Sequence, residues 1–228
     1  MPVTILKERL LGTQTLRCTV LFADLRGYTT LAERLNPAAV VALLDEFFSM
    51  VAQAVESHGG TIFHLAGDSA MAGFGLAEPG AGASRAAAEA NRAAINASRQ
   101  MVAAFGQIAA RWTSRFGVAT GIGVGLHVGD LACAEIGPAA VRRRTLIGDT
   151  VNVAARLCER ARAGEVLFSA GVAKGLGAAQ SSAMIALPDF TLRGREAPIA
   201  IFCIPARERL KLDPKPQDRP VEPPVAAV

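Results

Sequence analysis

One stretch of the chain decides the fold, Thr19-Val-Leu-Phe-Ala-Asp24-Leu-Arg-Gly27-Tyr-Thr-Thr-Leu-Ala-Glu-Arg34. An apolar run ends at a single acid, Asp24, and a glycine-containing turn and the start of a helix follow. This order predicts a strand that delivers a carboxylate beside backbone N–H groups free to bind an anion. A metal–phosphate site needs both groups. An acid that only caps a helix or forms a turn gives the same local pattern, so other segments of the sequence are needed to distinguish these roles from a metal–phosphate site.

The composition is that of an ordinary globular domain. The 228 residues, 51% of them hydrophobic, are enough to bury one core. The net charge of +4 and the pI of about 9.2 permit a small polyanion such as a nucleotide as ligand. The basic residues are scattered and aromatic residues make up only 5%, so we expect no nucleic-acid partner.

The cysteines and the lengths of the apolar segments indicate the cellular compartment of the protein. The four cysteines show no C-x-x-C spacing, so zinc is not expected, and Cys18 and Cys203 are interpreted as core thiols in a reducing compartment. No run reaches the roughly eighteen uninterrupted apolar residues of a membrane span, and the charged N-terminus does not have the pattern of a signal peptide. We therefore expect a cytoplasmic protein without a membrane segment.

Hydrophobic periodicity predicts the order strand, helix, hairpin, helix, hairpin, strand, helix, strand. Turns at Gly67-Asp68 and Gly129-Asp130 would close the two hairpins. This order indicates an α+β fold, ferredoxin-like, with helices packed on an antiparallel-rich sheet. We divide the chain into an N-terminal arm or linker (1–16), a folded domain (17–204) and a proline-rich charged tail (205–228) expected to be disordered. Strands are expected at 17–24, 61–65, 69–74, 121–128, 131–136, 142–147, 166–168, 183–187 and 199–204, and helices at 37–57, 84–115 and 150–161.

Two acids form the first group with possible chemistry. If the strand ending at Asp24 pairs with the hairpin that holds Asp68, the two carboxylates meet at adjacent strand ends and can bind two divalent metals. Such a pair favours in-line displacement at phosphorus, because the metals activate a hydroxyl and offset phosphate charge. The alternative is that Asp68 is an ordinary Gly-Asp turn residue.

Two further segments contribute polar groups. In Arg26-Gly27-Tyr28-Thr29-Thr30, at a helix start, the glycine lets a ligand approach the backbone and the helix dipole favours phosphate; a simple helix cap by a threonine is the alternative. In the segment 147–157, Asn152 and Arg156 are spaced i, i+4 and project from one helix face. An amide and a guanidinium together suit a ribose oxygen and a phosphate, although an exposed polar stripe has the same spacing.

Together and in this order, the three groups resemble one known family, the class III nucleotidyl cyclases, which comprise the adenylyl and guanylyl cyclases. The resemblance runs from about residue 17 to 204. It is carried by Phe22-Ala-Asp-Leu-Arg-Gly-Tyr-Thr29, Gly67-Asp68 and Gly148-Asp-Thr-Val-Asn-Val-Ala-Ala-Arg156.

The resemblance implies a head-to-tail homodimer with nucleotide sites at the interface. One chain would hold two Mg²⁺ or Mn²⁺ ions through Asp24, Asp68 and the backbone carbonyl of Leu25. The partner chain would supply Asn152 to position the ribose and Arg156 to stabilise charge on the α-phosphate. Attack of the 3′-hydroxyl on the α-phosphorus would then give a cyclic 3′,5′-nucleotide and pyrophosphate. The triphosphate would bind at the turn Arg26, Gly27, Tyr28 and Thr29, with help from Arg195 and from Arg142, Arg143 and Arg144, unless those four arginines are only a solvated surface.

The positions that recognise the base depart from the commonest pattern of the family. A lysine usually lies four residues before the second metal aspartate, and this chain has His64 there. The partner position, seven residues before Asn152, is Thr145, which is also familiar among bacterial adenylyl cyclases. Neutral imidazole can donate or accept a hydrogen bond, so His64 could serve guanine as well as adenine, or could simply pack in its strand.

Two hypotheses follow from the resemblance. The first is an active homodimeric cyclase that uses ATP, or alternatively GTP. The second is a cyclase-fold module with little turnover that acts as a nucleotide sensor or dimerisation partner. The four catalytic-type residues favour the first hypothesis, and only His64 favours the second.

Overall fold

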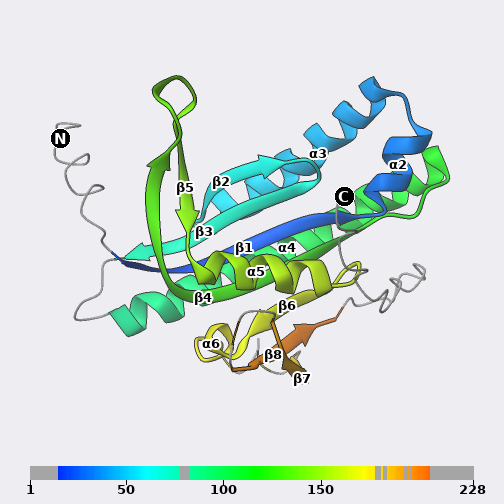
Figure 1. Ribbon diagram of the computed structural model, residues 1–228. Helices are drawn as coiled ribbons and strands as arrows, with labels where there is room; N and C mark the ends of the chain where they lie inside the picture. The colour runs from blue at the N-terminus through cyan, green and yellow to red at the C-terminus, as the bar shows by residue number, and fades with distance from the viewer. Residues whose placement is uncertain are drawn as a thin grey trace, which may run out of the picture.

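The protein is described here by a computed structural model, which covers residues 15–77, 83–177, 181, 184–192, 195 and 197–205. An open sheet forms the middle layer, with α3 (Pro37–Glu56) and α4 (Ala83–Phe116) on one face and α5 (Asp149–Arg160) on the other (Figure 1). The predicted arm and tail lie outside the described residues, apart from their innermost positions.

The sheet has the strand order β2-β3-β1-β4-β6-β8-β7, and β5 pairs with the outer half of β4. Only β4 and β6 pair in parallel; the other pairs described are antiparallel. The part β2-β3-β1-β4, with its two crossover helices, has the predicted ferredoxin-like arrangement, so the expected α+β fold is confirmed. The strands are β1 (Leu16–Arg26), β2 (Thr61–Ala66), β3 (Ser69–Ala77), β4 (Gly121–Ile136), β5 (Arg143–Ile147), β6 (Val166–Ser169), β7 (Ile185–Phe190) and β8 (Ile199–Ile204), and the shorter helices are α2 (Tyr28–Arg34), η1 (Ala139–Val141) and α6 (Ala170–Ala173).

Side-chain alternation along β1 sorts its residues between the two faces of the sheet. Leu21, Ala23 and Leu25 join the large core under α3 and α4. Cys18 and Val20 join a smaller core on the α5 side. Because side chains alternate along a strand, Asp24 and Arg26 share that second face, so both polar residues of β1 lie on the side of the sheet that α5 covers.

The second predicted hairpin is wrong. β4 runs unbroken from Gly121 to Ile136, and its Gly129-Asp130 pair lies opposite Cys18 and Arg17 of β1. A glycine at position 129 is explained by packing and not by a turn, because a Cβ there would stand 2.5 Å from the Thr150 hydroxyl of α5. The hairpin turn follows β4 instead, in residues 137–142, so the end of β4 and β5 form one projecting hairpin (Figure 1).

The ends of several other elements also differ from the prediction. β1 continues two residues past Asp24, because Leu25 and Arg26 still pair with β4. Gly27 ends the strand in the left-handed region, at φ 84°, and begins α2. The predicted strand 183–187 is β7, which extends to Phe190; residue 183 lies outside the described residues.

Helix α3 is capped and half-buried. Asn36 accepts a hydrogen bond from the Ala39 amide at 2.9 Å, and Pro37 occupies the first turn, as expected. Within the described residues, α3 is the one helix whose length and composition would suit a membrane span. Its inner face packs in the core, where the Phe47 ring meets the Phe105 ring of α4 edge-on at 5.9 Å.

The close packing of α5 on β4 follows from alternate glycines in β4. A Cβ at Gly125 would lie 2.1 Å from the Cys158 amide nitrogen and 2.5 Å from the Ala154 carbonyl oxygen. A Cβ at Gly123 would lie 2.4 Å from the Arg26 guanidinium. The glycine face of β4, defined here as Gly123, Gly125 and Gly129, therefore lets the helix backbone approach the strand directly.

We predict that Gly125→Ala destabilises the domain by about 2–3 kcal/mol, because backbone atoms of α5 must move to admit the methyl group. Denaturant unfolding measures the change. Gly106→Ala in α4 is the matched control: a Cβ there has open space, so the helix interior should gain about 0.5–1 kcal/mol. Equal stability of the two variants would contradict the described packing of α5.

Candidate active site

The structure brings the two predicted metal aspartates to neighbouring strands. Asp24 of β1 lies opposite Ser69, the first residue of β3, and Asp68 directly precedes that residue in the β2–β3 turn. The Leu25 amide donates a hydrogen bond to the Asp68 carbonyl at 3.1 Å, so the two acids are one step apart in register. The Gly67-Asp68 turn is confirmed as the turn of the β2–β3 hairpin, with Gly67 at φ 57°.

The carboxyl group of Asp68 has an altered acidity. Partial burial raises its pKa above the ordinary value, while a hydrogen bond from its own backbone amide and the charge of Arg26 act in the opposite direction. A divalent cation binds the ionised form of a carboxylate, so a cation here would offset the cost of desolvating that form.

Arg26 lies beside Asp24 and is largely buried, with 13% of its side chain exposed. Its Nη1 pairs with the Asp24 carboxylate. The rest of the guanidinium donates to the carbonyl oxygens of Cys158 and Ala161 at the C-terminal end of α5, the latter at 3.0 Å. The side chain of Arg26, the first residue of the turn predicted to bind the triphosphate, thus contacts β1 and α5 of its own chain.

The donor set suits divalent cations that arrive with a nucleotide. Mg²⁺ is usually bound by one or two protein carboxylates together with substrate phosphates and water, and Asp24 and Asp68 supply two carboxylates. The Arg26 guanidinium already places a cation against Asp24. Among the described residues there is no group of three or more histidine, cysteine, aspartate and glutamate side chains that could enclose a metal alone, so the substrate would have to complete the coordination.

The turn between β1 and α2 depends on Gly27. Its φ of 84° is unfavourable for other residues, and a Cβ would lie 2.7 Å from the Ala119 carbonyl oxygen. Gly27 is the N-cap of α2, and no side chain caps the helix, so the alternative interpretation of a threonine cap is wrong. Tyr28 packs partly against the core, whereas Thr29 is exposed.

The predicted polar face of α5 is present and is exposed to solvent. Asn152 and Arg156 are both exposed, while Val153, Ala154 and Leu157 on the opposite side are buried against the sheet. Arg156 contacts only its helix neighbour Glu159, at 2.7 Å, among the ion pairs of the described residues. A face that the chain does not bury against itself is available to a second molecule.

The two positions predicted to contact the base lie on strands that approach each other. His64 is exposed on β2, and Thr145 is half-buried on β5, which lies beside β2 in Figure 1. Their sequence neighbours meet directly, because the Arg144 guanidinium lies 5.7 Å from the centre of the Phe63 ring. His64 and Thr145 therefore lie on strands that are neighbours in the folded structure, although they are far apart in the sequence.

The arginines predicted as further phosphate ligands fall into two groups. Arg195 pairs with Asp149 in the first turn of α5 at 2.7 Å, and Arg144 donates to the Cys133 sulfur at 3.2 Å. Arg142 and Arg143 are exposed at the start of β5.

The sequence analysis missed a partly buried polar pair, which joins β4 to β6. His127 of β4 hydrogen-bonds through Nδ1 to the Ser169 hydroxyl of β6 at 2.7 Å. Burial, with help from the charge of Arg195, lowers the pKa of His127 to about 4, although Asp149 opposes the shift. The signal that could have found it is the run of alternate small residues from Gly121 to Gly129, which His127 interrupts.

The cysteine interpretation agrees with the structure. All four cysteines are buried and outside any disulfide, and burial raises the pKa values of Cys18 and Cys203 to about 12. Thiols of this kind are core residues and poor nucleophiles.

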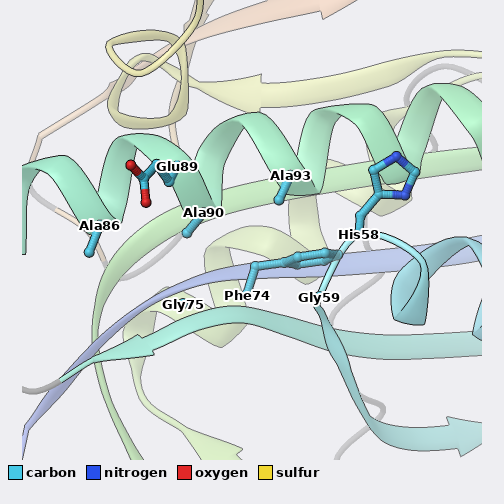
Figure 2. A pocket seen from close by; sticks show the side chains of 8 residues that line it. All are labelled: His58, Gly59, Phe74, Gly75, Ala86, Glu89, Ala90 and Ala93. Carbon is cyan, nitrogen blue, oxygen red and sulfur yellow. The ribbon is translucent and has the colours of Figure 1, made fainter.

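A pocket of about 300 Å³ lies away from these residues (Figure 2). It opens between α4, β3 and the turn after α3, with Phe74 and alanines along its walls and His58 and Glu89 among its polar residues. None of the predicted site residues lines it.

Comparison with known proteins identifies the family. The model for the adenylate and guanylate cyclase catalytic domain matches residues 12–205. The chain therefore belongs to this family, as the sequence motifs predicted.

Individual relatives are more distant. The chain is 26% identical to an adenylate cyclase of Anabaena cylindrica over 196 residues, covering 84% of this chain and 37% of that protein. It is 32% identical to adenylate cyclase 1 of Rhizobium meliloti over 142 residues, covering 61% of this chain and 20% of that protein. The chain thus spans well under half of either relative.

Solved structures show the same fold. The adenylyl cyclase CyaB from P. aeruginosa superposes with a TM-score of 0.75 at 25% identity, covering 87% of this chain and 98% of that one. The guanylyl cyclase Cya2 superposes with a TM-score of 0.71 at 24% identity, covering 88% and 98%. Cyclases named for either nucleotide thus share the fold, so the fold does not select the base.

We predict that His127 makes the stability of the domain fall in mild acid. The unfolded chain binds a proton at the ordinary histidine pKa of about 6.5, and the folded chain binds it only near 4, so the free energy of unfolding falls as the pH drops from about 6.5 to about 4. In His127→Asn the slope over this range should be shallower by up to about 1.4 kcal/mol per pH unit. Denaturant unfolding at a series of pH values measures it, and identical slopes would contradict a neutral buried histidine.

Proposed function

We propose that the protein is a nucleotidyl cyclase that converts ATP to cyclic 3′,5′-AMP and pyrophosphate. The observation that carries the proposal is the pairing of β1 with the β2–β3 hairpin, in which Asp24 lies opposite Ser69 and the Leu25 amide bonds the carbonyl of Asp68. Family membership supports the reaction class.

Each residue then has a defined task. Asp24, Asp68 and the Leu25 carbonyl hold two Mg²⁺ or Mn²⁺ ions, which activate the 3′-hydroxyl and offset phosphate charge when they are bound. The backbone of the turn from Arg26 to Thr29 holds the triphosphate. Positioning and electrostatics account for the rate, with no covalent intermediate.

The second half of the site comes from another copy of the chain. Asn152 positions the ribose and Arg156 stabilises charge on the α-phosphate, acting across the interface of a homodimer. The exposure of this face of α5 supports the assignment, because the chain does not use it internally. In this arrangement Arg195 reaches the terminal phosphates only after leaving Asp149.

The choice of nucleotide rests on His64 and Thr145. We favour ATP because the relatives from Anabaena cylindrica and Rhizobium meliloti are named adenylate cyclases. GTP is the second candidate, because an exposed imidazole can accept a hydrogen bond from the N–H groups of guanine. A cytoplasmic location agrees with a nucleoside triphosphate as substrate.

The central test mixes two inactive variants, Asp24→Ala and Arg156→Ala, in the presence of Mn²⁺ and ATP. Each variant alone should lose at least about 100-fold in rate, because each lacks one half of every site. Random mixing puts half of the chains in mixed dimers with one intact site each, so about a quarter of the wild-type activity should return. Cyclic product is measured by chromatography.

The controls separate the possible failures. Wild-type protein with GTP in place of ATP tests the second substrate. Asp24→Ala mixed with Asp68→Ala should recover nothing, because both changes disable the same half of the site. Recovery in that control, or full activity of Asp24→Ala alone, would refute the metal assignment, and no product from either nucleotide would favour the low-turnover module.

A second prediction concerns base selection. If His64 contacts the base, His64→Lys should raise the ratio of kcat/KM for ATP to that for GTP, by about tenfold for one gained hydrogen bond. His58→Lys is the matched control, because His58 bonds the Ala54 carbonyl in the turn after α3, away from β5. An unchanged ratio in His64→Lys would exclude a base contact.

A further inference from the structure

We propose that Arg26 is a positioning residue that links the carboxylate of Asp24 to helix α5, and thereby couples the two nucleotide sites of the dimer. The inference deepens the proposed function and rests on it. Asp24 would serve the site of its own chain, whereas Asn152 and Arg156, on α5, would serve the site of the partner.

The geometry consists of three bonds from one guanidinium. Nη1 pairs with Asp24, Nη2 donates to the Cys158 carbonyl, and Nε donates to the Ala161 carbonyl at 3.0 Å. These carbonyls belong to the last turn of α5 and its C-cap, and the Cys158 carbonyl also accepts a hydrogen bond from the Ala161 amide at 3.1 Å. A planar fork of donors can satisfy a carboxylate and two carbonyls together.

Gly123 of β4 makes room for this link. It lies opposite Asp24 in the sheet, and a Cβ there would stand 2.4 Å from Nη2 and 2.8 Å from the central guanidinium carbon of Arg26. Its backbone does not have a positive φ, so an alanine can be accommodated if the flexible end of Arg26 moves. The glycine therefore provides a way to displace the guanidinium without removing its charge.

The charges define what the link does. The carboxylate and the C-terminal end of α5 are both negative, and a permanently charged guanidinium between them stabilises both. A divalent cation at Asp24 competes with that guanidinium for the same carboxylate. Metal binding thus weakens the bond that fixes the guanidinium to Asp24, and the two other bonds of the same guanidinium hold the end of α5.

The helix transmits the change. α5 is a single helix of 12 residues packed directly on the glycine face of β4, and Asn152 and Arg156 project from its exposed side. A shift at its C-terminal end therefore moves both side chains together. In a dimer, metal binding at one site would therefore change the position of Asn152 and Arg156 at the other site. In this scheme the backbone of the turn binds the phosphates, and the Arg26 side chain does not.

The first experiment measures Mn²⁺ binding to the protein without nucleotide, by electron paramagnetic resonance. Arg26→Met should bind Mn²⁺ at least about threefold more tightly than wild type, because Asp24 loses a competing cation. Arg26→Lys should bind it nearly as wild type does, since an ammonium group still faces Asp24. Gly123→Ala should fall between the two. Arg92→Met is the matched control, because Arg92 also donates to a remote carbonyl, that of Gly175, and should leave the affinity unchanged.

The second experiment places the change in one chain of a mixed dimer. In the pair Asp68→Ala with Arg156→Ala, the Asp68→Ala chain keeps the Asp24–Arg26 pair and only lends its α5 to the single intact site. Adding Arg26→Met to this chain should lower kcat by about fivefold or more and leave the Mn²⁺ dependence unaltered. Adding it to the other chain should alter the Mn²⁺ dependence, and Arg92→Met should do neither.

The outcomes are distinct. Unchanged Mn²⁺ affinity in both Arg26→Met and Gly123→Ala would overturn the competition at Asp24, whether or not the protein is a cyclase. Unchanged kcat when Arg26→Met sits in the chain that lends α5 would overturn the coupling. If wild-type protein makes no cyclic product, the proposed function fails, while the Mn²⁺ measurement still decides the role of Arg26. If Arg26→Met does not fold, Arg26→Lys and Gly123→Ala carry both tests.

Discussion

The separation between α5 and β4 is the constraint on which the site depends. Gly125 allows the backbone of α5 to rest on the strand, with no side chain between them. That contact places the carbonyls of Cys158 and Ala161 within reach of Arg26 on the neighbouring strand. It also turns Asn152 outward, since the buried side of the helix is occupied by packing. A wider gap would remove the link to Asp24 and change where the exposed face points.

The sequence predicted much of the architecture and of the candidate site because their signals are local. The α+β fold, the Gly67-Asp68 turn, the capped α3 and the polar face of α5 each follow from residues close together in the chain. The neighbouring placement of Asp24 and Asp68 also followed, once the strands were assumed to pair. The metals, the nucleotide and the dimer remain proposals, because they depend on partners that the described chain does not contain.

The failures have a common physical cause. Gly129-Asp130 has the composition of a hairpin turn, but its glycine accommodates Thr150 of another element. The contacts of the Arg26 guanidinium were not predicted either, because it meets carbonyls more than 130 residues away in the sequence, while the phosphate role of its turn stays a prediction. In each case a long-range contact determines the role of the residue, and no window of local sequence contains it. His127 was missed for the same reason, since its partner Ser169 is on another strand.

The two aspartates are unequal before any ligand arrives. Asp24 carries a built-in counter-ion, so this partly buried carboxylate remains compensated without a metal. Asp68 has weaker compensation, and burial raises its pKa. Such a pair suits a site that loads its cations together with a nucleotide, because one carboxylate is already paired with Arg26 and the other gains a counter-charge when a cation binds.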